Sequence, residues 1–314
     1  MAEKIFVTGA TGTVGAACAA ALERAGFDVL RGSRRPIERS DESNWIQHGE
    51  LCHADDWVLH LNGCTTVVHC AGLAHLRNNQ FSAEQGRLVN TEGTAALARA
   101  SIAAGVSRFI FISSLLVHGD QSDADCALIE SATPRPQSAY ARSKFDAEAQ
   151  LKTVAQSRMD WTILRPPMIY GPSIKGNFPR LAKLVATRVP LPLGRATAPK
   201  SFLSIDNLAS AVTTLTTHPA ASNQVFLLSD DRVSSTADLI RLIAAALGTR
   251  AKLFNVPREL LRAAATVVGL NQDVDRMFKP LHVSNEKIRN LVRWTPPLSM
   301  EDAIRRALAD TSLS

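Results

Sequence analysis

Three polar residues, Ser114, Tyr140 and Lys144, have the types and spacing needed to move a proton. If one helix carries both Tyr140 and Lys144, their separation of four residues places them on the same face. A phenol has a pKa of about 10, and a neighbouring ammonium favours the phenolate and lowers that pKa. Ser114 follows an apolar run and would hydrogen-bond a reacting oxygen. The set predicts acid-base catalysis, although a tyrosine and a lysine at this spacing also occur by chance.

The segment VTGATGTVG near the N-terminus has glycines at positions 9, 12 and 15. It follows an apolar run, IFV, and opens an amphipathic helical pattern. Glycines permit a tight turn and a close approach to a pyrophosphate, and the helix N-terminus adds N–H groups. A strand, a glycine loop and a helix in this order form the context of a dinucleotide fingerprint. We therefore expect dinucleotide contacts at Gly9, Thr11, Gly12, Thr13, Val14 and Gly15.

Short apolar strands alternate with amphipathic helices in the first half of the chain. Nearly continuous apolar runs are typical of a parallel sheet that is covered on both faces. The expected strands are Lys4–Thr8, Asp28–Gly32, Thr66–His69, Arg108–Ser113 and Trp161–Leu164. After a first helix that ends at Gly26, the expected helices cover about 83–104, 138–156, 206–216, 235–247, 259–268 and 300–309. The pattern predicts an α/β fold with a doubly wound parallel sheet of the Rossmann type.

Prolines and glycines become frequent after Pro166, which indicates shorter elements and more loops. We interpret residues 1–168 as a dinucleotide-binding Rossmann domain and residues 169–314 mainly as a smaller substrate-binding lobe. Residues 201–230 are expected to return to the Rossmann domain. The smaller lobe would then cover the cleft at the strand ends.

Composition excludes several classes of protein. No apolar run approaches the roughly 20 residues of a membrane span, and the N-terminus lacks the order of a signal peptide. The five cysteines, without a CxxC pair, argue against a disulfide framework or a zinc site. The net charge of +6 comes from scattered Lys and Arg residues, which favours anionic ligands over a nucleic-acid surface. We expect a cytoplasmic protein without a metal, membrane or nucleic-acid partner.

TGATGTVG, together with Tyr140-x-x-x-Lys144, resembles the extended short-chain dehydrogenase/reductase family of the NAD-dependent epimerase/dehydratase type. Other similar segments follow in the family's order over nearly the whole chain: HCAG at 69–72, VNTEGT at 89–94, SSLLVHG at 113–119, RPPMIYGP at 165–172 and SFLSIDNLASAV at 201–212. The segment from Gly171 to Gly194 looks most like bacterial nucleotide-sugar epimerases and 4-keto reductases. The resemblance implies a homodimer built partly from the helices at 84–104 and 138–156.

The resemblance also implies roles for individual residues. Ser114, Tyr140 and Lys144 match the catalytic positions, with Tyr140 giving or taking a proton while hydride is transferred. Tyr140 and Lys144 would also contact the cofactor. The remaining implied cofactor contacts are Glu50, Leu51, Cys70, Ala71, Gly72, Asn90 and Pro167. For Asn90, a hydrogen-bonded core amide is an equal alternative.

The end of the second strand bears on the choice of nicotinamide cofactor. An acidic residue there would hydrogen-bond the adenosine ribose and favour NAD. Ser33 occupies that position, and Arg34 and Arg35 follow it. Guanidinium groups make charge-assisted bonds to a 2′-phosphate, so we expect NADP(H), with NAD(H) as the alternative. For Arg35, a solvated basic turn is an equal alternative.

The expected substrate contacts are Ser114, His118, Met168, Asn177 and Lys200. Asn177 matches a family position near the diphosphate of a sugar nucleotide. Lys200 stands where relatives have an arginine that binds a phosphate. His118 and Met168 depart from the Tyr and Asn of many relatives, and a packed loop histidine is the alternative for His118.

The residues after Ser114 bear on the type of reaction. Sugar dehydratases of the family carry Asp-Glu at this point, whereas Leu115-Leu116 occur here, which disfavours dehydration. The leading hypothesis is the NADPH-dependent reduction of a 4-keto nucleotide sugar, with a UDP-sugar as the expected partner. The alternatives are a nucleotide-sugar 4-epimerase with tightly held NAD, a reductase of a non-sugar aldehyde or ketone, and an NADPH-sensing regulator without turnover.

Overall fold

The apolar runs of the first half of the chain form one parallel sheet. The computed structural model describes residues 2–34, 44–52, 57–73, 82–174, 176–267 and 271–309, so that Arg35 lies outside the described residues. Seven strands lie in the order β3-β2-β1-β4-β5-β6-β9, and every neighbouring pair is parallel. Their bounds are β1 Lys4–Thr8, β2 Asp28–Ser33, β3 Trp45–Gln47, β4 Thr66–His69, β5 Arg108–Ile112, β6 Asp160–Arg165 and β9 Gln224–Leu227. The predicted doubly wound sheet is confirmed.

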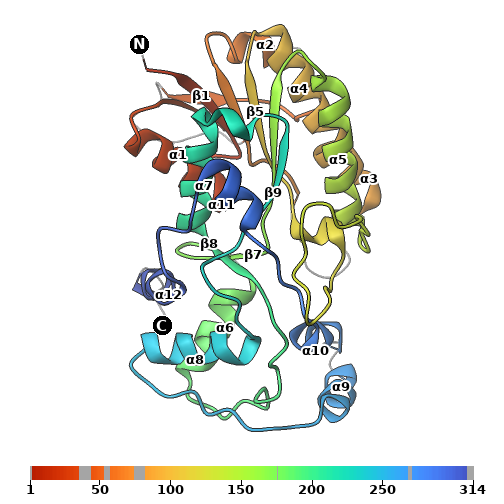
Figure 1. Ribbon diagram of the computed structural model, residues 1–314, viewed down its shortest axis with the longest axis vertical. Helices are drawn as coiled ribbons and strands as arrows, with labels where there is room; N and C mark the ends of the chain where they lie inside the picture. The colour runs from red at the N-terminus through yellow and green to blue at the C-terminus, as the bar shows by residue number, and fades with distance from the viewer. Residues whose placement is uncertain are drawn as a thin grey trace.

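Helices cover both faces of this sheet (Figure 1). On one face lie α1 (Thr13–Arg24), α7 (Ile205–Thr217) and α11 (Glu286–Val292), packed on a core that includes Ile5 and Val7. On the other face lie α2 (Trp57–His60), α4 (Gly93–Ala103) and α5 (Ala139–Ala155), packed on a core that includes Phe6. Alternate side chains of β1 thus enter opposite cores, which explains why the run is apolar throughout.

A smaller lobe lies beyond one end of the sheet (Figure 1). It contains a two-stranded parallel sheet of β7 (Met168–Tyr170) and β8 (Phe202–Ser204). Its helices are α6 (Asn177–Ala186), α8 (Thr236–Ala246), α9 (Arg258–Val267), α10 (Asn271–Phe278) and α12 (Met300–Ala309). Side chains of α6, α8 and α12 share one buried core. Between β8 and α8 the chain returns to the large sheet, because α7 packs on α1 and β9 pairs with β6.

One predicted helix differs in its internal winding. The predicted helix at 83–104 is continuous, but it consists of α3 (Ala83–Gly86), a π-helical segment (Arg87–Glu92) and α4. A π-helical turn is rare and often lies at a functional site. Side-chain periodicity alone does not show the change of winding. Two 3₁₀ segments, Leu115–His118 and Pro219–Ala221, are also absent from the sequence prediction.

Neither a membrane-spanning helix nor a metal-binding cluster is found among the described residues. No helix in this part of the chain is long and apolar enough to cross a membrane. The same residues contain no cluster of three or more His, Cys, Asp or Glu side chains suited to a metal ion.

Candidate active site

The glycine loop between β1 and α1 is packed so closely that it requires glycine at two positions. Gly9 has a positive φ of +65°, and a Cβ there would lie 2.9 Å from the backbone of Ala71. A Cβ on Gly15 would lie 2.3 Å from the carbonyl oxygen of Gly9. Gly12 is the N-cap of α1 and has no side chain to accept from the first N–H groups. A bound anion can take that role, because a helix N-terminus attracts negative charge.

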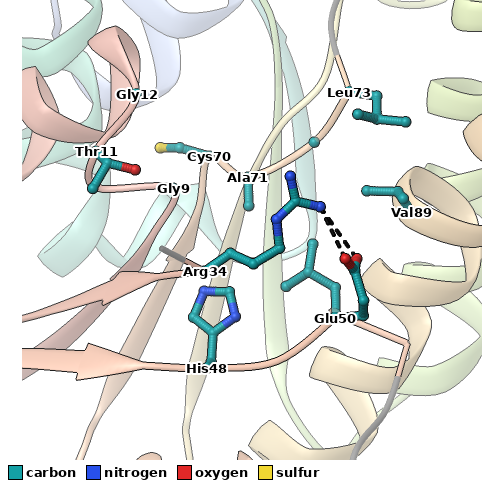
Figure 2. Close-up of a pocket in the computed structure, with 12 residues that line it drawn as sticks. Gly9, Thr11, Gly12, Arg34, His48, Glu50, Cys70, Ala71, Leu73 and Val89 are labelled. Atoms are coloured by element: carbon teal, nitrogen blue, oxygen red, sulfur yellow. Dashed lines mark hydrogen bonds and ion pairs between the residues drawn. The ribbon is translucent and has the colours of Figure 1, made fainter. Parts of the chain in front are cut away.

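A pocket of about 350 Å³ lies at the carboxyl ends of the strands β1 to β4 (Figure 2). Its lining comes from the glycine loop, the segments after β2, β3 and β4, and the π-helical segment. The lining residues are Gly9, Thr11, Gly12, Arg34, His48, Glu50, Leu51, Cys70, Ala71, Gly72, Leu73 and Val89. Nine of the seventeen described residues that the sequence assigned to cofactor binding are therefore brought together here. This position at the strand ends, with a glycine cradle that no other residue would fit, suits a dinucleotide.

Arg34 and Glu50 face each other across one end of the pocket (Figure 2). Arg34 Nη1 donates to both carboxylate oxygens of Glu50, at 3.0 and 3.3 Å. The two side chains are 53% and 46% exposed, so the pair contributes little to stability. Ser33 is buried at the end of β2. In this structure the guanidinium that was expected at a 2′-phosphate is thus paired with a carboxylate.

His48 is a pocket residue that the sequence reasoning missed. It lies just beyond β3, and its Nδ1 donates to the carbonyl of Gly49 at 2.8 Å, so that Nε2 keeps the lone pair. Nε2 is buried and has no hydrogen-bond partner among the described residues. Burial lowers the pKa of His48, with smaller effects from His60 and Arg34 in the same direction. The sequence offered one indication that His48 lies in the pocket: it stands two residues before Glu50, an expected cofactor contact.

Ser114 and Tyr140 are brought together at the carboxyl end of β5. Ser114 is the N-cap of the 3₁₀ segment, where its Oγ accepts from the N–H of Leu116 at 3.2 Å. Tyr140 lies in the first turn of α5, which begins after a Ser138 cap. The two side chains are hydrogen-bonded. Burial raises the pKa of Tyr140 and the Ser114 hydrogen bond opposes that rise, with the net direction upward.

Lys144 lies one helical turn after Tyr140 and is buried. Its Nζ donates to the carbonyl of Ile112 at 2.9 Å and lies 4.6 Å from the centroid of the Phe111 ring. Burial lowers the pKa of Lys144 to about 8, while Cys70 and then Glu148 act to raise it. The ammonium is therefore the main form at neutral pH, and it is less strongly held than on the surface.

Gly72 lies between the pocket and Lys144. A Cβ there would lie 2.9 Å from Asn90 Oδ1 and 3.3 Å from Lys144 Nζ, so the glycine leaves open volume beside both groups. Asn90, in the π-helical segment, accepts from the N–H of Leu73 at 2.8 Å and donates to Ser143 Oγ at 2.9 Å. Asn90 thus fixes the loop after β4 against α5, which is the role of a hydrogen-bonded core amide.

The expected substrate contacts differ in their exposure to solvent. Met168 and Asn177 are exposed, at the start of β7 and of α6. His118 is buried, and its Nε2 accepts from Arg165 Nη1 at 2.7 Å. Burial, then Arg165, lowers the pKa of His118 to about 4, as suits a packed, neutral histidine.

Lys200 donates to main-chain carbonyls in this structure. Its Nζ lies 2.8 Å from the oxygen of Arg276 and 2.6 Å from that of Lys279. Burial lowers the pKa of Lys200 to about 8. These bonds tie the segment that leads into β8 to the last turn of α10 and to the residue after it. Pro167, half-buried between β6 and β7, is the remaining expected cofactor contact.

Comparison with known proteins gives the family. The sequence model of the NAD dependent epimerase/dehydratase family matches residues 5–228. The chain is 35% identical to UDP-glucose 4-epimerase of Vibrio cholerae over 310 residues, which cover 98% of this chain and 94% of the relative. It is 26% identical to GDP-6-deoxy-D-mannose reductase of Pseudomonas aeruginosa over 257 residues, 78% of this chain and 79% of the relative.

A solved structure, MoeE5 in complex with UDP-glucuronic acid and NAD, has the same fold. Its TM-score is 0.77 at 20% sequence identity, and the match covers 98% of this chain and 98% of that chain. The family match extends over most of the sheet and over the segments that carry Ser114, Tyr140 and Lys144. The chain is therefore an enzyme of the NAD dependent epimerase/dehydratase family, within the extended short-chain dehydrogenases/reductases.

Proposed function

We propose that the protein reduces the 4-keto group of a nucleotide-linked sugar with NADPH, and that Tyr140 gives the proton. The observation that carries this proposal is the hydrogen bond of Tyr140 with Ser114, one helical turn from the buried Lys144. Burial raises the pKa of Tyr140, so the phenol is protonated at neutral pH and suits a proton donor. The glycine-lined pocket leads to Lys144 through Gly72.

Tyr140, Ser114 and Lys144 have different roles in the reduction of the carbonyl group. Tyr140 donates its proton to the carbonyl oxygen as negative charge develops there, and Ser114 hydrogen-bonds the same oxygen. The Lys144 ammonium stabilises the phenolate that remains and holds the ribose next to the reacting centre. A bound reduced nicotinamide supplies the two electrons and the hydrogen that the carbonyl carbon gains.

NADP(H) is the proposed cofactor because the end of β2 has a serine and an arginine instead of a carboxylate. Arg34 lines the pocket, and its pair with Glu50 is half-exposed and therefore weak. A 2′-phosphate is a doubly charged competitor for the same guanidinium. The adenine would lie beside Glu50 and Leu51, and the pyrophosphate at the start of α1.

A UDP-linked sugar is the proposed substrate. Support comes from the relative named UDP-glucose 4-epimerase and from MoeE5, whose structure contains UDP-glucuronic acid. Met168 and Asn177 are the exposed candidates for sugar and diphosphate contacts in the smaller lobe.

A nucleotide-sugar 4-epimerase with tightly held NAD is the second candidate. The observation that favours it is the 35% identity with UDP-glucose 4-epimerase of Vibrio cholerae over 98% of this chain. In that reaction Tyr140 would act first as a base and then as an acid. The pairing of Arg34 with Glu50 also fits a cofactor without a 2′-phosphate.

The two candidates differ in the cofactor that the purified protein carries. We would denature the protein gently, identify released nucleotides by mass spectrometry, and titrate the protein with NADH and NADPH. An empty protein that binds NADPH more tightly supports net reduction. Stoichiometric retained NAD would support the epimerase instead.

A further inference from the structure

A buried ion pair lies directly behind the catalytic residues. Arg165, the last residue of β6, donates to Glu148 of α5 through Nε at 2.9 Å and through Nη2 at 2.5 Å. The two side chains are only 5% and 2% exposed. Ser113 Oγ donates to the same carboxylate at 2.6 Å, and the remaining Arg165 nitrogen donates to His118 at 2.7 Å. All three guanidinium nitrogens of Arg165 and both carboxylate oxygens of Glu148 therefore have hydrogen-bond partners.

The ion pair connects the segments that carry the catalytic side chains. Ser113 precedes Ser114 in the chain, and His118 ends the 3₁₀ segment that Ser114 caps. Glu148 lies on α5 one turn after Lys144 and two turns after Tyr140, on the same face of the helix. Displacement of Glu148 would therefore change the position of Ser114 relative to Tyr140.

The charge of Glu148 also acts on Lys144. Lys144 is buried, with Tyr140 one turn before it and Cys70 and His69 on the neighbouring strand end. Among these neighbours His69 is held neutral, because burial lowers its pKa to about 3. The Glu148 carboxylate raises the pKa of Lys144 and opposes the effect of burial.

Besides Lys144, Glu148 has three cationic or titratable neighbours in the part of the chain that the structure describes. Arg165 pairs with it directly, Lys152 lies one turn further along α5, and His118 is neutral. The Arg165 guanidinium, 2.5 Å from the carboxylate, offsets part of the field of Glu148 at Lys144.

Stability alone is a weak reason for such a pair. Removal of two charges from water costs much of what their attraction returns, and apolar residues of similar size are often as stable. A buried pair that joins α5 and β6 to the segment that carries Ser114 is better explained by the geometry and charge that it provides to the site.

We propose that Glu148 is a positioning residue that fixes Ser114 against Tyr140 through Ser113 and Arg165, and that its charge keeps Lys144 an ammonium at the working pH. The proposal rests on the roles of Tyr140 and Lys144 given under Proposed function. It adds one consequence that does not depend on the substrate: neutralisation of Glu148 must make Lys144 lose its proton at lower pH.

The test follows the titration of Lys144 by NMR in the full chain labelled with ¹³Cε-lysine, without substrate or cofactor. Lys144→Met identifies the resonance by its loss. The variants are Glu148→Gln and the double variant Glu148→Gln/Arg165→Met, which keeps the fold testable because it leaves no unpaired buried guanidinium. Asp146→Asn is the matched control, since it removes an acidic group from the same helix two residues from Lys144.

We expect a midpoint of about 8 for Lys144 in the native protein and in Asp146→Asn, and a midpoint at lower pH in Glu148→Gln. The double variant loses both charges of the pair, so we expect a smaller shift there than in Glu148→Gln. An unchanged midpoint in folded Glu148→Gln, or a larger shift in the double variant than in Glu148→Gln, overturns the proposal. Loss of the fold in both would show a purely structural role and overturn it as well. Because no turnover is measured, this result stands apart from any failure of the proposed reaction.

A second variant separates charge from position. Glu148→Asp keeps the carboxylate but shortens its reach to Ser113 and Arg165. We expect its Lys144 midpoint to stay near the native value, while kcat for the native substrate falls at least tenfold and KM changes little. Native kcat in Glu148→Asp would contradict the positioning role.

Discussion

At the residue scale, burial shifts the pKa values of two neighbouring groups in opposite directions and separates them. Burial raises the pKa of the Tyr140 phenol and lowers the pKa of the Lys144 ammonium to about 8. Both groups are therefore protonated at neutral pH, which is the state needed for a proton donor beside a cation. Lys144 has the lower pKa of the two groups, so its loss of a proton sets the upper limit of the pH range of activity.

The first prediction concerns this pH range. The pKa of Lys144 is lowered, so its ammonium is present below about pH 8 and is lost as pH rises through that value. We expect kcat/KM for carbonyl reduction to be constant near neutral pH and to fall above about pH 8. A profile that stays flat up to pH 10 would contradict the role of the Lys144 ammonium.

The second prediction concerns the Arg34–Glu50 pair. Glu50→Gln removes the charge that competes for Arg34, so NADPH should bind more tightly while NADH changes little. Arg34→Ala should weaken NADPH by roughly 10-fold to 100-fold, since a hydrogen bond to a charged group contributes about 1.5–3 kcal/mol. Fluorescence titration of both variants with NADH and NADPH measures this. Equal changes for the two cofactors would exclude a 2′-phosphate contact at Arg34.

Residue types predicted the site better than they predicted its hydrogen-bond partners. The spacing of Tyr140 and Lys144 on one helix indicated their shared face, and the structure places Ser114 against Tyr140. The pairing of Arg34 with Glu50 and the carbonyl partners of Lys200 join segments far apart in the chain. Such contacts depend on tertiary packing, which no local pattern specifies.

At the element scale, the pocket depends on how closely β1, the glycine loop and α1 approach one another. Gly15 lies where a Cβ would meet the Gly9 carbonyl oxygen at 2.3 Å, well inside contact distance. The backbone there has nowhere to move, because Gly9 itself lies against Ala71. The length of the loop and the start of the helix are therefore fixed together.

The third prediction tests this packing. Gly15→Ala should displace the loop from α1, and we expect dinucleotide affinity to fall at least tenfold with a loss of about 1–3 kcal/mol in unfolding free energy. Gly49→Ala is the matched control, since a Cβ at Gly49 meets nothing within 4 Å. Calorimetric titration and urea unfolding measure both effects. Native affinity in a folded Gly15→Ala protein would show that the loop is not the dinucleotide site.

Elements with strong local patterns were predictable, and those without such patterns were not. The five expected strands match β1, β2, β4, β5 and β6 to within one residue at each end, because buried parallel strands are apolar throughout. β3 has only three residues, and β9 is buried in its second half alone, whereas β4, of the same length as β9, is buried throughout. The π-helical segment at Asn90 depends on packing against the loop after β4.

At the scale of the whole molecule, a buried polar network holds the smaller lobe to the end of the large sheet. Asp230, which follows β9, accepts from Tyr170 of β7 at 2.6 Å and from Asn207 of α7 at 2.7 Å. The N–H of Ser204 in β8 also donates to it at 2.9 Å. Burial raises the pKa of Asp230 to about 6 in spite of these donors.

The fourth prediction follows from that raised pKa. Asp230 binds its proton more tightly in the native state than in the unfolded state, where the pKa is about 3.8. Its contribution to stability is therefore present at low pH and is lost as pH rises from about 4 to 6, on the order of 3 kcal/mol. Urea unfolding across this range should show that loss in the native protein and not in Asp230→Asn. The exposed Asp273→Asn control should behave like the native protein.

The sequence predicted two lobes and a return of residues 201–230 to the Rossmann domain, but not the contacts that join the lobes. The chain enters the smaller lobe after β6, returns through α7 and β9, and leaves again (Figure 1). The contacts of Asp230 with Tyr170 and Asn207 link residues far apart in the chain, so no local pattern predicts them. The homodimer through the helices at 84–104 and 138–156 stays a prediction, which sedimentation equilibrium would test.

The most direct test of the account is the stoichiometry of NADPH oxidation with a UDP-linked 4-keto-6-deoxy sugar. The account predicts one NADPH oxidised for each keto group reduced, and a loss of at least 100-fold in kcat for Tyr140→Phe with unchanged NADPH binding. Interconversion of UDP-glucose and UDP-galactose by the native protein, with no NADPH consumed, would contradict net reduction and establish the epimerase. Normal turnover in Tyr140→Phe would contradict the assignment of the proton donor itself.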